Sequence, residues 1–438
     1  MELKRELGLR DISLFAISCI VGTRWIAAAA HAGPGAVSLW LLGAVFFLVP
    51  LAIAVATLSA RYPGAGGLYL WTRGDYGPWH GFLAFWVYWM GIALWFPSAA
   101  LFYMSAGFYT LGPRYQALAE NRFWVLAAAL AAIWIALGTN LVGVRIGKWT
   151  ENVGAAATWL LGGAFIALAV VAWRRVGPAT PMHVAPHWDW ATVSFWSTIA
   201  YAMSGMELAG FMSGEIRDPL RTLPRAGWIS AAFATVFYAG STMALLVLLR
   251  PEKISELNGL AEAGEAGGRL LGLAWLSPAI ALLVLTSAVG QIGGLGTGVS
   301  RLPFAAGVDR LLPKAFGYVH PRWGTPYVSI LALGGVATFL LVAIQLGDTL
   351  RAAYDELVSL MVIVGFLPFG YIFGGAWKAG KRLSALAGGG ITALAIACAV
   401  VPTASITNVW LFEGKLALGT GAVIASAMLV YRRHARGQ

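Results

Sequence analysis

Charged residues are scarce in this sequence. Asp, Glu, Lys and Arg make up 11% of its 438 residues, whereas they make up about a quarter of ordinary soluble domains. Apolar and aromatic residues make up 59%, against about 45–50% in soluble domains. This composition excludes an ordinary soluble fold. It favours a protein with many membrane-spanning helices, each of which needs about 20 mostly apolar residues.

Cysteine and the common catalytic motifs are also nearly absent. The two cysteines, Cys19 and Cys398, lie inside apolar runs, so no secreted disulfide framework is expected. The sequence contains no H-E-x-x-H, C-x-x-C, G-x-x-x-x-G-K-[ST] or G-x-S-x-G pattern, which mark metalloproteases, thiol or zinc sites, phosphate-binding loops and serine hydrolases. We therefore expect neither an enzyme nor a bound metal or cofactor. A coupling ion, Na⁺ or H⁺, stays open.

What the sequence does contain is a series of long apolar runs bounded by Gly, Pro or charged residues. They predict an all-α polytopic membrane protein with twelve transmembrane helices, forming a single transporter domain over residues 1–438. The predicted spans are 12–32, 38–59, 79–111, 123–142, 152–173, 192–213, 227–249, 273–300, 327–346, 356–376, 384–402 and 412–431.

The basic residues predict the orientation of these spans. The chain has 30 Lys and Arg against 19 Asp and Glu, a net charge of +11. With the N-terminus inside, 20 of the basic residues fall in cytoplasmic segments and 9 in outer segments, which is the positive-inside pattern. Orientation thus explains the charge without nucleic acid as a partner. We expect an integral protein of the plasma (cell inner) membrane, in contact with lipid, with both termini cytoplasmic. The sequence does not determine the oligomeric state.

Two predicted spans, the first and the sixth, are interrupted by a glycine close to an ionisable residue. The interruptions are Gly22-Thr23-Arg24-Trp25 and Ser204-Gly205-Met206-Glu207. Broken helices in corresponding positions of two halves indicate the substrate site of a transporter, because the broken backbone exposes N–H and C=O groups.

The spacing of the two interruptions predicts the internal organisation of the domain. The second interrupted span begins five spans after the first, and this spacing is typical of a five-plus-five inverted repeat. The first repeat is expected over 12–174 and the second over 192–376, while 384–431 holds two additional helices.

Arg24 is the least expected residue in these spans, since it lies near the predicted midplane of the membrane. A lone arginine there costs at least about 2.5–3.5 kcal/mol on insertion, so it needs a carboxylate, exposed carbonyl groups or water. Glu207 lies at a similar predicted depth. One interpretation is a structural ion pair between Arg24 and Glu207. The other is direct participation in substrate or proton handling, and the two can coexist.

Further runs carry a resemblance to a known family. Residues 214–226 follow the pattern G-E-x-x-[DN]-P-x-[RK]-x-[LI]-P-[RK]-A, and 62–71, 300–314 and 324–326 match in order and position. Over essentially its whole length the chain resembles the amino acid permeases of the amino acid-polyamine-organocation (APC) superfamily. The resemblance implies the leucine-transporter-like fold and alternating-access transport of amino acids or related amines.

The resemblance also implies a role for the first interruption. In the family this break reads G-[ST]-G-[IV], and its backbone N–H groups receive the substrate carboxylate. Gly22 and Thr23 match this pattern, whereas Arg24 and Trp25 depart from it. Arg24 would either bind the carboxylate directly as a bidentate partner or fill the pocket and change the substrate.

At the second interruption, Gly205 and Glu207 match the family's glycine and acidic residue. Tyr201 matches an aromatic residue that caps bound substrate, with ordinary packing as the alternative. The predicted substrate-binding set is therefore Gly22, Thr23, Arg24, Trp25, Tyr201, Ser204, Gly205 and Glu207. Glu215, at the cytoplasmic end of the sixth span, is predicted to be a gate or structural residue.

Four functions follow from these observations, in decreasing order of support. The first is a secondary active transporter, symporter or exchanger, of amino acids. The second is a carrier of polyamines or other organic cations, which Arg24 disfavours unless Glu207 or Tyr201 outweighs its charge. A channel or receptor is third, and a membrane-embedded enzyme is fourth.

Overall fold

The computed structural model describes residues 5, 7–64, 66–142, 144–183, 185, 190–344, 350–402 and 408–435. The end of the predicted span 327–346, at residues 345 and 346, lies outside the described residues.

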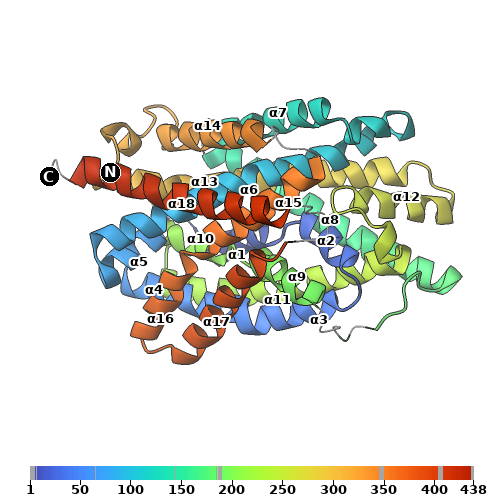
Figure 1. Ribbon diagram of the computed structural model, residues 1–438, viewed down its shortest axis with the longest axis horizontal. Helices are drawn as coiled ribbons and strands as arrows, with labels where there is room; N and C mark the ends of the chain where they lie inside the picture. The colour runs from blue at the N-terminus through green and yellow to red at the C-terminus, as the bar shows by residue number, and fades with distance from the viewer. Residues whose placement is uncertain are drawn as a thin grey trace.

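The described part of the chain is helical, and Figure 1 shows that many of the long helices run along the long axis of the molecule. An isolated parallel β-bridge joins Leu7 to Ile216. The α-helices are α1 (Leu9–Ile20), α2 (Arg24–His31), α3 (Ala36–Gly43), α4 (Val49–Arg61), α5 (Gly67–Tyr76), α6 (Pro78–Gly107), α7 (Arg122–Leu141), α8 (Val144–Val176), α9 (Trp190–Ala202), α10 (Met206–Phe211), α11 (Pro219–Leu248), α12 (Gly259–Leu271), α13 (Leu276–Val308), α14 (Tyr327–Ile344), α15 (Leu350–Phe366), α16 (Phe369–Lys378), α17 (Arg382–Ala399) and α18 (Val409–Ala435).

The lengths of these helices confirm a polytopic membrane protein. Within the described residues, nine helical segments are long and apolar enough to cross a membrane, or ten when the bent pair α1 and α2 counts as one. The predicted spans 192–213 and 327–346 correspond to elements outside that count, the pair α9 and α10 and the shorter helix α14. The number twelve and the inverted repeat stay predictions.

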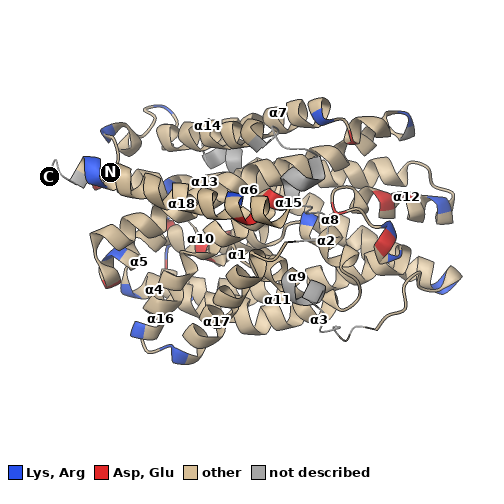
Figure 2. Cartoon of the chain, in the orientation of Figure 1, with Lys and Arg blue, Asp and Glu red and all other residues tan. Residues whose placement is uncertain are grey.

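The described ends of the chain lie at the same end of the molecule (Figure 1), which agrees with an even number of crossings. We call this end the terminal end of the bundle. Lys and Arg lie mainly towards the two ends of the long axis, and a few charged residues of both signs lie near the middle, beside the labels α6, α10 and α15 (Figure 2). This distribution fits helices that cross an apolar layer. Which end faces the cytoplasm stays a prediction.

Glycines allow the central helices to pack at short distances. A Cβ atom on Gly154 of α8 would lie 2.4 Å from the Cα atom of Gly290 on α13, and one on Gly91 of α6 would lie 2.9 Å from Gly365 on α15. Small residues permit such close backbone approach between membrane helices. Through these contacts α8 packs closely on α13, and α6 packs closely on α15.

Candidate functional site at two broken helices

The first break lies between α1 and α2, whose axes differ by 44°. The backbone N–H of Gly22 donates a hydrogen bond to the Tyr238 hydroxyl of α11 at 2.8 Å. The carbonyl oxygen of Val21 accepts one from Gln291 Nε2 of α13 at 3.1 Å. Backbone groups without helical partners must be satisfied inside a membrane protein. Side chains of two other helices therefore hold this break in place, and the N–H of Gly22 is already occupied.

The second break, between α9 and α10, packs directly on the first. Gly205 has a φ of +120°, a conformation that favours glycine. A Cβ atom there would lie 2.8 Å from the carbonyl carbon and oxygen of Cys19. The Tyr238 hydroxyl also lies 2.7 Å from the Ile20 carbonyl oxygen and 3.2 Å from that of Ala202. One side chain thus contacts the backbone of both breaks.

Arg24 is the first residue of α2 and is only 1% exposed. Its Nη1 donates to Ser98 Oγ at 2.7 Å, and its Nη2 lies 3.6 Å from Met361 Sδ. Its guanidinium carbon lies 3.9 Å from the ring centroid of Trp25 and 5.3 Å from that of Trp95, within the range of cation–π attraction. Within the described residues Arg24 has no acidic partner, and its Nε has no hydrogen-bond acceptor.

Glu207 is also 1% exposed, but its carboxylate has its own partners. Oε1 accepts a hydrogen bond from the Tyr88 hydroxyl at 2.7 Å, and Oε2 accepts one from the backbone N–H of Gly205 at 2.9 Å. Both Glu207 and Arg24 are described residues, and they form no ion pair with each other in this structure. The ion pair, one of the two interpretations of Arg24, is therefore not formed in this conformation, because α6 supplies separate partners, Ser98 to Arg24 and Tyr88 to Glu207.

The other predicted ligands surround the same breaks. Trp25 packs edge-on against Tyr201 with ring centroids 6.2 Å apart, and Tyr201 packs against Phe366 at 5.4 Å. Ser204 donates its hydroxyl to the carbonyl oxygen of Tyr201 at 2.7 Å. Thr23 is buried at the residue before α2. The structure brings these residues together, and their role as substrate ligands stays a prediction.

Glu215 follows α10, the short helix after the second break, and its carboxylate contacts neither break. Its Oε1 accepts from Arg301 Nε at 2.7 Å, and its Oε2 lies 3.3 Å from Arg301 Nη2. Its carbonyl oxygen accepts from the backbone N–H of Leu7 at 3.0 Å. Glu215 therefore ties the segment before α1 and the segment after α10 to α13. This position is compatible with either predicted role, gate or structural residue.

Sequence reasoning did not assign several residues that contact the predicted site. Tyr88, Trp95 and Ser98 are spaced by seven and three residues, so they share one face of α6, and this spacing could have indicated a joint role. Tyr238 and Met361 gave no comparable signal, because a tyrosine or methionine in an apolar helix is typical of ordinary packing.

Three relatives extend over most of the chain. An uncharacterized transporter of Mycobacterium tuberculosis is 31% identical over 346 residues, covering 77% of this chain and 74% of the relative. The "probable agmatine/putrescine antiporter AguD" of Lactococcus lactis is 26% identical and covers 83% and 79%. The glutamate/serine transporter AimA of Bacillus subtilis is 24% identical and covers 84% and 70%.

The fold is similar to that of a solved transporter structure. MhsT in complex with L-phenylalanine superposes with a TM-score of 0.61 over 94% of this chain and 100% of MhsT, at 16% sequence identity. MhsT has the leucine-transporter-like fold, so the likeness supports that fold for this chain and no more. The family model for amino acid permeases matches residues 7–430. The chain, an integral membrane transporter, therefore belongs to the amino acid permease family of the APC superfamily.

Proposed function

We propose that the protein is a secondary active transporter that moves amino acids across the plasma membrane by alternating access, as a symporter or an exchanger. The substrate would bind at the two breaks, at Gly22 to Trp25 and at Ser204 to Glu207, with Tyr201 beside it. The proposal includes an inverted repeat over 12–174 and 192–376, which relates the two breaks. The single observation that carries it is the buried guanidinium of Arg24 without an acidic partner among the described residues.

A buried arginine of this kind favours an anionic ligand group. Taking a charge out of water costs several kcal/mol, which an opposite charge with good hydrogen-bond geometry offsets. Ser98 occupies one nitrogen of Arg24, and Nε has no acceptor within the described residues. A substrate carboxylate would supply both the charge and the acceptors. Because the Gly22 N–H is bound to Tyr238, Arg24 is the better-placed donor in this conformation.

The alternative substrate class, polyamines or other organic cations, has one observation in its favour. Glu207 is a buried carboxylate beside the second break, and a relative carries agmatine and putrescine in its name. Both oxygens of Glu207, however, already accept hydrogen bonds. The guanidinium of Arg24 already contacts the groups near the first break that would receive a cation. These are the rings of Trp25 and Trp95, the Ser98 hydroxyl and the Met361 thioether. We therefore place amino acids first.

Uptake into proteoliposomes tests this proposal. Purified protein is reconstituted, and accumulation of labelled neutral and acidic amino acids is measured with a Na⁺ gradient, with a pH gradient or with unlabelled substrate inside. Saturable uptake with counterflow is expected, and the gradient that drives it identifies the coupling. Flux that neither saturates nor shows counterflow would instead support a channel. Stronger competition by putrescine or arginine than by neutral and acidic amino acids would favour the organic-cation carrier.

A further inference from the structure

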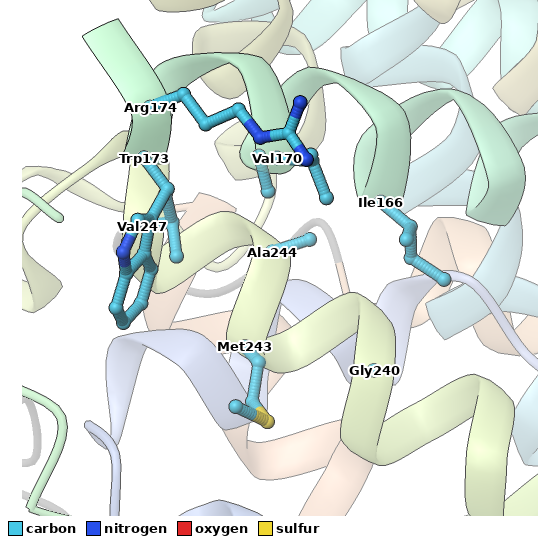
Figure 3. A pocket seen from close by; sticks show the side chains of 9 residues that line it. Ile166, Val170, Trp173, Arg174, Gly240, Met243, Ala244 and Val247 are labelled. Atoms are coloured by element: carbon cyan, nitrogen blue, oxygen red, sulfur yellow. The ribbon is translucent and has the colours of Figure 1, made fainter. Parts of the chain in front are cut away.

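A groove on the outer surface of the bundle lies between α8 and α11. It encloses about 390 Å³, which is within the usual range for small-molecule sites, about 300–1,000 Å³. Ala169 and Ala244 in the lining are buried, whereas the larger Ile166, Val170, Trp173 and Met243 are exposed. Figure 3 shows side chains from both helices around the groove. The lining residues are Ile166, Ala169, Val170, Trp173, Arg174, Gly240, Met243, Ala244 and Val247.

One end of the groove is fixed by hydrogen bonds between the segments that follow its two helices. The backbone N–H of Ala179 donates to the carbonyl oxygen of Val247 at 2.9 Å. The hydroxyl of Thr180 donates to the carbonyl oxygen of Leu249 at 2.9 Å. These bonds tie the segment after α8 to the end of α11, so the two walls are held together at this end.

Gly240 keeps the middle of the groove open. A Cβ atom on Gly240 would lie 3.5 Å from Ile166 Cδ1, an ordinary van der Waals contact, with no other atom within 4 Å. A larger side chain at this position would therefore extend into the groove without forcing the backbones apart. The depth of the groove depends on this missing side chain.

Among the described residues that line the groove, one is charged, Arg174 in the last turn of α8 next to Trp173. Figure 3 shows its side chain extending back along α8 towards Val170. Trp and Arg near the end of a span are typical of the membrane interface. Within the part of the chain that the structure describes, Arg174 forms no ion pair. The groove thus combines an apolar body with a cation at one end that forms no ion pair with any described residue.

We propose that this groove binds an anionic phospholipid, with one acyl chain between α8 and α11 and the phosphate on Arg174. The apolar lining complements the acyl chain, and the guanidinium complements the phosphate through charge and bidentate hydrogen bonds. α8 and α11 contain candidate membrane spans, and Ile166, Val170 and Met243 in the groove are exposed apolar side chains, so a phospholipid would reach the groove without leaving the membrane. The site is separate from the two breaks and independent of the transported substrate.

Native mass spectrometry of the delipidated, full-length protein tests this site. The fraction of protein that carries one lipid is measured against the concentration of phosphatidylglycerol and of phosphatidylcholine with the same acyl chains. Phosphatidylglycerol is expected to bind more tightly. Arg174→Gln should weaken its binding about fivefold, as one basic residue contributes near an anionic headgroup, whereas the matched control Arg175→Gln, on the same helix turn but outside the groove, should not.

A second pair of variants tests the acyl-chain part of the site. Gly240→Leu fills the groove and is expected to reduce the binding of both lipids. Gly163→Leu on α8, where a Cβ atom would meet nothing within 4 Å and which does not line the groove, is the control. Equal binding of the two lipids, equal effects of the two arginine variants, or unchanged binding in Gly240→Leu would each overturn the proposal. A dimer that Gly240→Leu disrupts would assign the groove to a second copy of the chain. If Gly240→Leu fails to fold, the comparison of Arg174→Gln with Arg175→Gln still tests whether Arg174 binds the lipid headgroup.

Discussion

The Tyr238 hydroxyl accepts a hydrogen bond from the backbone N–H of Gly22 at 2.8 Å, at the point where the first helix is broken. The same oxygen lies 2.7 Å from the carbonyl oxygen of Ile20 and 3.2 Å from that of Ala202. The Tyr238 ring stacks on Trp40 with centroids 4.2 Å apart. A rigidly held phenol on α11 thus substitutes for helical hydrogen bonds that both breaks lack.

Replacing Tyr238 by phenylalanine should destabilise the protein. The ring stacking on Trp40 is kept, but buried backbone groups at both breaks lose their partner, which costs about 1–3 kcal/mol for each unsatisfied group. A lower thermal unfolding midpoint in detergent is the expected result. Tyr115→Phe, at a residue that is 45% exposed, serves as the control. An unchanged midpoint in Tyr238→Phe would mean that water satisfies these groups equally well.

Gly205→Ala should lower the stability of the protein more than the addition of one methyl group suggests. The alanine would need a φ of +120° and would place its Cβ 2.8 Å from the Cys19 carbonyl group. Strained backbone of this kind costs about 1–3 kcal/mol. Gly163→Ala in α8 is the matched control, with free space around its Cβ, and should be stabilising by up to about 1 kcal/mol. Equal effects of the two variants on thermal unfolding would contradict the close contact between the breaks.

Arg24→Ala should abolish most substrate binding while the protein still folds and inserts. The loss of a charge-assisted hydrogen bond to a carboxylate, about 1.5–3 kcal/mol, corresponds to roughly 10- to 150-fold weaker binding. Arg24→Lys should rescue poorly, since a point charge cannot reproduce bidentate geometry. Amino acid binding is measured by thermal shift and by uptake, with the exposed Arg269→Ala as control. Near-normal uptake by Arg24→Ala would exclude a role in substrate binding, and loss of the folded protein would point to a structural role.

Breaking the pair between Arg301 and Glu215 should open the terminal end of the bundle. Hydrogen bonds between charged groups contribute about 1.5–3 kcal/mol, so Arg301→Gln should favour the open form by at least tenfold. Cys19 reports on this opening, because it is 6% exposed beside the second break.

The rate of maleimide labelling of Cys19 is measured with Cys398 replaced by alanine, and it should rise in both Arg301→Gln and Glu215→Gln. Substrate that closes the site should slow it again. If labelling stays slow while the unfolding midpoint falls, Glu215 is a structural residue and not part of a gate.

Glu262, on α12 outside the candidate spans, should make stability depend on pH. Burial raises the pKa of its carboxyl, with a smaller contribution from Glu265, while the Ser255 N–H and His31 act in the opposite direction. A raised pKa means that the folded state holds the proton more tightly, so stability falls as pH rises through that pKa. Glu262→Gln should therefore match the parent protein near pH 4 and exceed its unfolding midpoint at pH 8. Glu252→Gln is the control, and a constant difference across this range would refute the assignment.

The sequence contains enough information to predict the class of the protein and the location of the breaks. A glycine beside an ionisable residue inside an apolar run, as at Gly22 and Gly205, is a local signal, because an intact membrane helix has no reason to contain it. The structure confirms a helical membrane bundle and shows helices that end at Ile20 and Ala202. The run from 214 to 226 predicted the family, which the family model confirms.

The partners of the two buried charges were decided only by the tertiary structure. Matched depth in two spans suggested that Arg24 pairs with Glu207, but depth does not fix the rotation of a helix or what lies between two side chains. Arg24 instead contacts Ser98 and Met361, which are 74 and 337 residues away in sequence, and Glu207 contacts Tyr88. Apolar periodicity determines which residues can be buried, whereas the packing of α6 and α15 against the breaks determines which buried groups meet.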